Sequence, residues 1–458
     1  MKYLIEYGSD FLEFDSEHPI EVIGMSNPPA PVPMPDTIEK VLINPIHSES
    51  LLKLAKSKIK QNLLSQAVIV VSDNTRPVPY YGREGILIPI IEVLLDAGFS
   101  QDKVTILIGA GSHRNMEADE IEAMIGLSAL GFSEIKVVNH EYDDEEKLIF
   151  LGQTSNGSDV YLNRDYYMAD LKIVTGLVES HFMAGASGGR KGICPGIVGI
   201  DTLTIFHGGR FLSSLMAADL ILEGNPLHDE ASEVASLAGC DFLVNVTLDN
   251  DKRVTGVFAG DLFMAHQEAV AKIKDYVVVP LPQRYDIVLI PAGFVGINHY
   301  QGAKAATEAA RAVKEGGKII IVAKNNDVDP VGGLGYKEAL QLLAREGSRK
   351  FQELILTSHW KIIQEQWQVQ MWCKVFDVIK EEKNLYYCSL EIPEPAYDIL
   401  PGVAGIKMLA QKDRDLPAEK CMKLMIEKAL TDAIKTSDAK DPSILLLKDG
   451  PYGIPQVI

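Results

Sequence analysis

The chain has 458 residues, of which 47% are hydrophobic and 23% charged, the composition of a soluble globular protein. Its formal net charge of −19 argues against a nucleic-acid partner, because phosphate binding needs a clustered basic surface. No stretch reaches the roughly 18 consecutive apolar residues of a membrane span, and the N-terminus lacks the basic and apolar regions of a signal peptide. An anionic ligand would need a local basic pocket.

The five cysteines are scattered, odd in number and never spaced as CxxC. This pattern is typical of reduced thiols and offers neither a zinc site nor a disulfide framework. We therefore expect a cytoplasmic protein.

The first part of the chain alternates short apolar runs with amphipathic segments. After strand-like residues and a proline-rich loop up to about Asp36, we predict a strand at 66–73, a helix at 83–99 and strands at 102–111 and 171–178. Continuous apolar strands separated by helices indicate a parallel sheet covered on both faces.

A second α/β rhythm begins near residue 280. It predicts a strand at 285–293, a helix at 302–317 that stops at Gly316-Gly317, and a strand at 318–326. We expect an N-terminal cofactor-binding α/β domain (1–278) and a C-terminal α/β domain (279–404). The proline-broken segment 389–407 is expected to leave the second domain, and the tail (405–458) to return to the first.

The predicted fold class is therefore α/β, with two domains that each hold a largely parallel sheet covered by helices. Ligands of such sheets bind beyond the carboxyl ends of the strands. Three polar loops follow predicted strands there: SDNTRPVP, GAGSHR and VESHFMAGASGGRKG. We expect the active site at these loops, in the cleft between the domains.

The most informative segment is ESHFMAGASGGRKGICPGIVGIDTLTIFHGGR, residues 179–210. Its glycines would let backbone N–H groups approach an anion closely, which favours a nucleotide-like ligand. The order of Gly189, Arg190, Lys191 and Gly192 does not match a P-loop, and a tight surface turn is the structural alternative.

Three histidines, His113, His181 and His207, lie just past apolar strands or in glycine-rich loops. One such histidine is more often a hydrogen-bonded structural residue, but three together favour a functional site. Imidazole exchanges protons near neutral pH and also binds nickel.

A further cluster opens the first helix of the second domain: Tyr300, Gln301 and Lys304. Gln301 and Lys304 share one helix face, and with Arg76 they could hold a small carboxylate. The alternative is an ordinary solvated lysine at a helix start.

Taken together, these segments resemble the signature blocks of the nickel-dependent lactate racemase family, whose members racemise or epimerise 2-hydroxyacids. The blocks are SDNTRPVP, GAGSHR, ESHFMAGASGGRKGICPGIVG, FHGGR, NPLHDE, DFLVNV, NHYQGAKA and EQWQVQ, and they follow the family order over about residues 1–425.

The resemblance implies a cofactor that composition could not reveal. It is the nickel-pincer nucleotide, a pyridinium-3,5-bisthiocarboxylic acid mononucleotide that binds Ni²⁺ and is joined to a lysine, here Lys191. The remaining nickel ligand corresponds to His207. The turn formed by Asp73, Asn74, Thr75 and Arg76 resembles the cofactor-binding turn of the family, and Trp367 its tryptophan near the cofactor; Trp360 is the weaker candidate. Other proteins must build and insert this cofactor.

Removing the α-proton of a hydroxyacid is difficult because a carboxylate acidifies that carbon poorly. A hydride route avoids the carbanion: a base takes the hydroxyl proton while hydride moves to the cofactor. His113 and His181 form the natural acid–base pair, and the resemblance implies the same roles. Arg76 and Lys304 would bind the substrate carboxylate, Gln301 would hydrogen-bond the substrate, and Tyr300 would help to shape the pocket.

Two alternatives remain open at this stage. A nicotinamide-dependent 2-hydroxyacid oxidoreductase would carry G-x-G-x-x-G after an early strand, whereas GAGSHR breaks off after Gly111. A non-catalytic nucleotide- or metal-binding homologue would lack one of His113, His181, Lys191 and His207, and all four are present. The sequence leaves the particular 2-hydroxyacid and the oligomeric state open.

Overall fold

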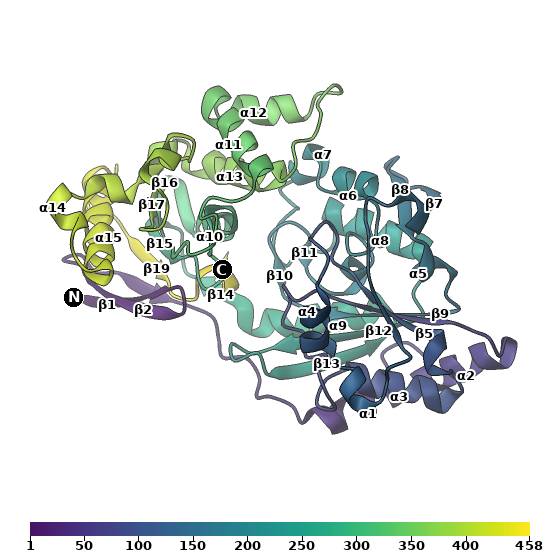
Figure 1. Cartoon of the computed structure of the whole chain (residues 1–458). Helices are drawn as coiled ribbons and strands as arrows, with labels where there is room; N and C mark the ends of the chain where they lie inside the picture. Colours follow the sequence, from purple (N-terminus) through teal and green to yellow (C-terminus); the bar gives the residue numbers. More distant parts are fainter. The chain divides into compact units, whose positions relative to one another are not determined.

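The computed structural model describes residues 1–458 and divides into two compact units (Figure 1). The central unit comprises residues 27–275, and the terminal unit comprises residues 1–26 together with 276–458. None of the helices combines the length and apolar content needed to cross a membrane.

The central unit is built on a six-stranded sheet with the order β13-β12-β9-β4-β5-β6, in which only β13 is antiparallel. Its strands are β4 (Ala67–Val71), β5 (Val104–Ile108), β6 (Lys136–Asn139), β9 (Leu171–Leu177), β12 (Phe242–Leu248) and β13 (Val254–Gly260). All five residues of β4 are buried, as expected for a strand with both faces covered.

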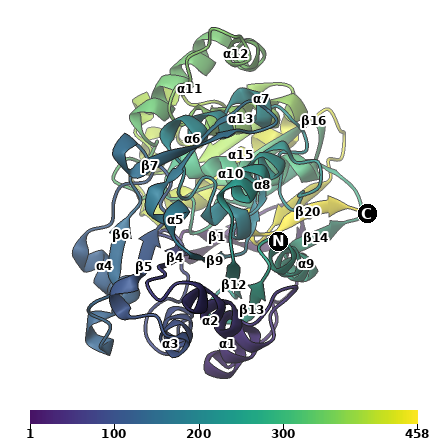
Figure 2. The same cartoon turned by 90° about the vertical axis from the view of Figure 1, so that its right-hand side faces the viewer.

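Helices and two small hairpins complete the central unit. The helices are α1 (Met34–Ile43), α2 (Leu51–Gln61), α3 (Leu87–Ala97), α4 (Ala118–Ile125), α5 (Arg164–Met168), α6 (Ile200–Phe206), α7 (Gly209–Leu212), α8 (Pro226–Ala238) and α9 (Met264–Val277). The hairpins are β7 (Leu148–Gln153) with β8 (Asp159–Asn163), and β10 (Ser180–His181) with β11 (Gly185–Ala186). Figure 2 shows α1, α2 and α3 gathered on one side of the sheet.

The terminal unit holds a second six-stranded sheet, entirely parallel, with the order β18-β17-β16-β15-β19-β3. Its strands are β3 (Glu21–Ile23), β15 (Tyr285–Pro291), β16 (Val313–Val322), β17 (Leu385–Cys388), β18 (Val403–Ala404) and β19 (Ile444–Leu447). Two further pairs are β1 (Lys2–Tyr7) with β2 (Asp10–Asp15), and β14 (Val278–Leu281) with β20 (Ile454–Val457).

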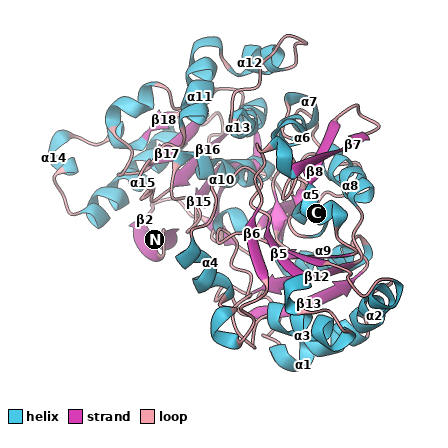
Figure 3. Ribbon diagram, turned by 45° about the vertical axis from the view of Figure 1, so that its right-hand side comes forward, coloured by secondary structure: helices cyan, strands magenta, loops and turns pink.

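Helices cover both faces of this sheet, drawn in cyan around the magenta strands in Figure 3. They are α10 (His299–Ala312), α11 (Leu334–Glu346), α12 (Ser348–Ile355), α13 (Gln366–Ile379), α14 (Gln411–Arg414) and α15 (Ala418–Lys435). One apolar core joins the sheet to α10, α11 and α13, and another joins it to α15 and the β1–β2 hairpin.

The fold class predicted from the sequence is confirmed, but three details of the chain path are wrong. The tail does not return to the central unit, because β19 pairs with β15 and completes the second sheet. Segment 389–407 does not leave, because β18 pairs with β17. The first residues belong to the terminal unit, since β3 pairs with β19.

One predicted helix also ends too late. The helix expected to stop at Gly316-Gly317 ends at Ala312, and Val313 already pairs with Tyr285 in the sheet. A register shift follows before Lys318 pairs with Ile287, so the two glycines lie in an irregular strand rather than at a helix end.

In both sheets the chain adds strands on one side of a central strand, β4 or β15, and then crosses to add the next strand on its other side. In the central unit the chain runs from β4 outward through β5 and β6, then crosses to β9 on the other side of β4. In doubly wound sheets such a reversal opens a crevice at the carboxyl ends of the strands, where ligands bind. The loops after β4, β5 and β9 meet this condition, and they carry the predicted site.

Candidate functional site

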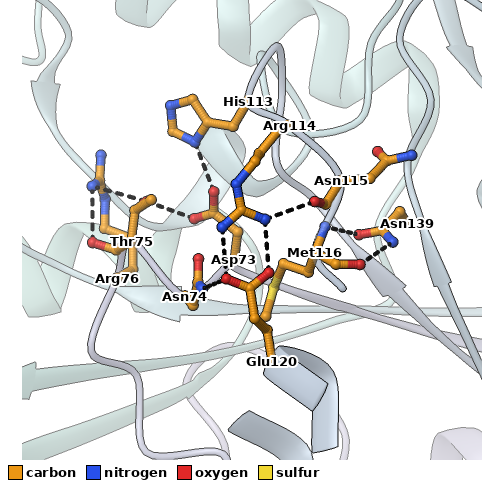
Figure 4. Close-up of polar contacts among 10 residues, drawn as sticks. All are labelled: Asp73, Asn74, Thr75, Arg76, His113, Arg114, Asn115, Met116, Glu120 and Asn139. Atoms are coloured by element: carbon orange, nitrogen blue, oxygen red, sulfur yellow. Dashed lines mark hydrogen bonds and ion pairs between the residues drawn. The ribbon is translucent and has the colours of Figure 1, made fainter. Parts of the chain in front are cut away.

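The loop after β4 is organised around the Asp73 carboxylate, which is 5% exposed. Its Oδ2 lies 2.7 Å from Nδ1 of His113, and its Oδ1 accepts a hydrogen bond of 2.6 Å from the Thr75 hydroxyl. Figure 4 shows both side chains directed at this carboxylate. Both oxygens of Asp73 are therefore engaged by residues of the same site.

The Asp73 carboxyl is ionised at neutral pH despite its burial. Burial alone would raise its pKa, but the hydrogen bonds from His113 and Thr75, with the charges of His113 and Arg76, outweigh this and lower the pKa. An ionised carboxylate can only accept hydrogen bonds, so His113 must donate through Nδ1. In the neutral ring, Nε2 of His113 is then the acceptor.

The rest of this loop is tied to the loop after β5 through Glu120 of α4. Asn74 donates to Glu120 at 3.2 Å, and Arg114 binds Glu120 through two contacts of 2.6 and 2.7 Å (Figure 4). Arg114 comes directly after His113, so this ion pair helps to fix the histidine loop. Arg76 is partly exposed and its guanidinium contacts the Thr75 carbonyl at 3.4 Å.

His181 lies on the opposite side of β4, in the short β10–β11 hairpin that follows β9. Its Nδ1 accepts hydrogen bonds from the backbone N–H groups of Met183 and Ala184, at 3.3 and 3.2 Å. The sheet order thus puts the two histidine loops on the strands that flank β4, whose own loop carries Asp73 and Arg76.

The glycine-rich loop is packed against the sheet and is not a surface turn. Gly189 has φ +54°, and a Cβ there would lie 2.5 Å from Cγ of His266. Gly188 has φ +72°, and its Cβ would lie 2.9 Å from Oδ1 of Asn245. Only glycine fits both positions, because each combines a left-handed backbone with a close neighbour. This packing carries the chain into the short helical turn Gly189–Gly192, which holds Lys191.

His207 ends α6 and stands edge-on to Phe206. Its Nδ1 lies 3.1 Å from the Leu203 carbonyl, which can only accept, so Nδ1 carries the proton and Nε2 keeps a lone pair. Desolvation, followed by the charge of Lys191, lowers the pKa of His207 to about 4. The imidazole is therefore neutral at neutral pH, as a metal ligand must be, and it lies within the electrostatic reach of Lys191.

Three residues that support the site were not assigned a role from the sequence. Asn245 of β12 accepts from Gly189 N at 2.9 Å and donates to the Gly176 carbonyl at 3.2 Å. Arg190 is fully buried and donates to the carbonyls of Ala184 and Ala186 at 2.6 and 2.9 Å. A polar residue inside an apolar strand, as in DFLVNV, is a signal that could have identified Asn245.

The third supporting residue is Asn225, which caps α8. Its Oδ1 accepts from Leu227 N at 3.0 Å, and its Nδ2 donates to the Met183 carbonyl at 3.0 Å. The Asn-Pro pair of NPLHDE predicts a helix start, but not this link to the His181 hairpin.

In the terminal unit, two of the predicted residues are brought together. Nε1 of Trp367 donates to the Tyr300 hydroxyl at 2.8 Å, and Gln368 donates to the Tyr300 carbonyl at 2.5 Å. Gln301 and Lys304 lie one and four residues further along α10, and Oε1 of Gln301 is buried without a partner. A buried amide oxygen without a partner is an available acceptor for a ligand.

Trp360, the weaker candidate, does not share the contact of Trp367 with Tyr300. Its Nε1 donates to Oε1 of Gln366 at 2.8 Å. No group of three or more His, Cys, Asp or Glu side chains is arranged to hold a metal ion.

Comparison with known proteins identifies the family. The model of the lactate racemase N-terminal domain matches residues 7–218, and that of the lactate racemase C-terminal domain matches residues 283–383. The chain belongs to the lactate racemase family. It is therefore a racemase, an enzyme of the isomerase class.

Individual relatives agree with this assignment. The chain is 35% identical over 343 residues to the lactate racemase of Lactiplantibacillus plantarum, covering 74% of this chain and 77% of the relative. It is 29% identical over 374 residues to that of Thermoanaerobacterium thermosaccharolyticum, covering 80% and 83%. The relatives are thus matched over most of their length.

Solved structures share the fold. The lactate racemase apoprotein from T. thermosaccharolyticum superposes with a TM-score of 0.82 at 25% identity, covering 100% of both chains. A protein from Thermotoga maritima, at 16% identity and a TM-score of 0.59, covers 90% of this chain and 99% of its own and shares the fold alone.

Proposed function

We propose that the protein racemises a lactate-like 2-hydroxyacid with a nickel-pincer nucleotide held on Lys191. The single observation that carries this proposal is the order of the central sheet. His113 and His181 lie in the segments that follow β5 and β9, the two strands that flank β4. The loop after β4 carries the Asp73 carboxylate, which binds His113. Racemisation needs proton exchange at either face of a planar keto acid, and two imidazoles that follow the strands on either side of β4 suit it.

The donors near Lys191 support a nickel nucleotide. Lys191 would provide the amine to which the nucleotide is joined, and the nearby His207 would bind nickel through Nε2. The Leu203 carbonyl orients the ring by accepting from Nδ1, as an outer partner of a metal-bound histidine does. When bound, the cofactor would supply the acceptor for the substrate's α-hydrogen.

The chain's own residues would handle the substrate's proton and charge. His113 would accept the hydroxyl proton at Nε2, and the Asp73 carboxylate would stabilise the resulting imidazolium. His181 would exchange the proton for the other enantiomer. Arg76 and Lys304 are the cations that we assign to the substrate carboxylate, with Gln301 as a hydrogen-bonding partner and Tyr300, supported by Trp367, shaping the pocket.

A direct test is chiral chromatography of single-enantiomer 2-hydroxyacids after incubation with protein that carries its cofactor. We expect racemisation of at least one short 2-hydroxyacid, and loss of it in His113→Gln and in His181→Gln. Arg349→Gln, on an exposed helix of the terminal unit, is the control and should keep full activity. A loaded enzyme that inverts no 2-hydroxyacid of the panel would refute the proposal.

A further inference from the structure

His113 and His181 are surrounded by opposite hydrogen-bonding groups at the same ring nitrogen. Nδ1 of His113 faces the carboxylate of Asp73, whereas Nδ1 of His181 faces two backbone N–H groups. We propose that the free enzyme holds the two imidazoles in opposite tautomers, and that Asp73 is the positioning residue that sets the tautomer of His113. This inference rests on the proposed function, which makes these imidazoles the acid–base pair.

At His113, the Asp73 carboxylate is compatible with only one tautomer of the neutral ring. Thr75 occupies Oδ1 of Asp73 and donates to it, so Oδ2 is the oxygen that binds the ring, at 2.7 Å. The proton therefore sits on Nδ1, and Nε2 carries the lone pair. The side chain of His113 is 53% exposed, so this lone pair is accessible to a substrate hydroxyl.

At His181, the backbone N–H groups are compatible only with the opposite tautomer of the neutral ring. Two N–H groups point at Nδ1, so Nδ1 must carry the lone pair and the neutral ring keeps its proton on Nε2. The Met183–Ala184 peptide that donates is itself held, because Asn225 binds its Met183 carbonyl, and Arg190 binds the carbonyl of the following peptide at Ala184. Both supports are buried, so the hairpin cannot easily turn its N–H groups away.

The two histidines are thus chemically unlike before substrate binds. His113 is ready to accept a hydroxyl proton, and the carboxylate stabilises the imidazolium that forms. His181 is ready to donate a hydrogen bond from Nε2 to the substrate oxygen. Enantiomers have equal free energies, so kcat/KM must stay equal in both directions, and the asymmetry appears only in kcat and KM taken separately.

Long-range ¹H–¹⁵N spectra of histidine rings test this directly, since they distinguish a protonated ring nitrogen from a bare one. The full chain is labelled with ¹⁵N-histidine, and the two signals are assigned with His113→Gln and His181→Gln. We expect Nδ1–H in His113 and Nε2–H in His181. The same tautomer in both rings, or His113 with its proton on Nε2, would overturn the proposal.

Asp73→Asn provides the second arm. An amide can donate to Nδ1, so we expect the His113 proton to move to Nε2 while the His181 signal stays unchanged. Racemisation by the loaded enzyme should fall by roughly 10²–10⁴-fold, the usual contribution of a general base. Asp102→Asn, an exposed carboxylate before β5, is the matched control and should change neither quantity. An unchanged His113 signal in Asp73→Asn would contradict the role of Asp73.

The NMR measurement of the tautomers does not depend on whether the protein turns over substrate, so the two proposals can fail separately. Opposite tautomers in a loaded protein that racemises nothing would refute the proposed function alone. Full racemisation by a protein with identical tautomers would refute this inference alone.

Discussion

At the level of single residues, the partner of Nδ1 distinguishes the three histidines of the site. His113 donates to a carboxylate, His207 donates to the Leu203 carbonyl, and His181 accepts from backbone N–H groups. For a neutral imidazole, the partner at one nitrogen determines what the other can do. His207 and His113 each present a lone pair, which suits a metal ligand and a base.

Lys191 should carry a covalent adduct when the protein is made in a host that synthesises the cofactor. We expect intact mass spectrometry to show added mass on the wild-type chain and none on Lys191→Ala. The control, Lys252→Ala at an exposed turn, should keep the adduct. A fully active enzyme of unmodified mass would contradict the attachment.

His207→Ala should lose nickel while the fold is retained. The neutral Nε2 of His207 is the one protein ligand that we assign to the metal, and its pKa of about 4 keeps it unprotonated above mild acid. Metal analysis by mass spectrometry and a thermal melt check the two halves of this expectation. His359→Ala, on an exposed loop, should keep full nickel occupancy. Full occupancy in His207→Ala would show that the ligand is another residue.

The predicted site residues came from motifs, and the structure brings some of them together within each unit. Asp73, Thr75 and His113 share hydrogen bonds, and Tyr300 bonds Trp367. The contacts that hold them could not be predicted, because Asn245 and Asn225 bind backbone groups of distant segments and Arg190 binds carbonyls whose direction depends on how its own loop folds. Such partners depend on the tertiary path of the chain rather than on local spacing.

At the level of elements, the turn after β11 depends on glycines that leave no space for a side chain. Gly189→Ala should destabilise the protein by about 1–3 kcal/mol, because it adds a left-handed alanine and a Cβ that collides with His266. Gly157→Ala is the matched control: it has φ +80° but no atom within 4 Å of the added Cβ. Urea unfolding measures both variants.

In Gly157→Ala the free energy of unfolding should decrease by only about 1 kcal/mol, the cost of an alanine in the left-handed backbone conformation. Equal losses in the two variants would mean that packing against His266 contributes nothing. In Gly189→Ala we also expect a lower yield of the Lys191 adduct, since Lys191 lies two residues further on in the same turn.

The strands and helices of both units follow from periodicity, whereas their ends and partners do not. The buried run of β4 and the apolar helix α3 were predictable because nearly every residue is apolar. The end of α10 was not, because Val313 is drawn into the sheet by its pairing with Tyr285. Sheet pairing overrode the helix-stop signal of Gly316-Gly317.

At the level of the whole molecule, buried neutral histidines limit stability in acid. Desolvation lowers the pKa of His299 from 6.5 to about 3, and desolvation together with the charge of Arg190 lowers that of His266 to about 3. The unfolded chain binds these protons first. The free energy of unfolding is therefore unaffected by these groups above about pH 6.5 and falls as pH decreases toward about 3.

In His299→Gln the free energy of unfolding should decrease less in acid than it does in the wild type. Between about pH 6.5 and 4.5, one such histidine accounts for roughly 2–3 kcal/mol of the decrease in the free energy of unfolding. Urea titrations of wild type and variant at the two pH values measure the difference. His359→Gln, at an exposed position, should leave the decrease unchanged. An identical decrease in wild type and His299→Gln would contradict the burial argument.

The pairing of β3 with β19 also affects the order in which the chain folds during synthesis. Strand β3 is synthesised long before its partner at Ile444–Leu447. The central unit, residues 27–275, is complete long before that, and domains generally fold as units while the chain grows. The growing chain therefore holds β3 unpaired while the central unit folds, and the second sheet cannot close until β19 has been synthesised.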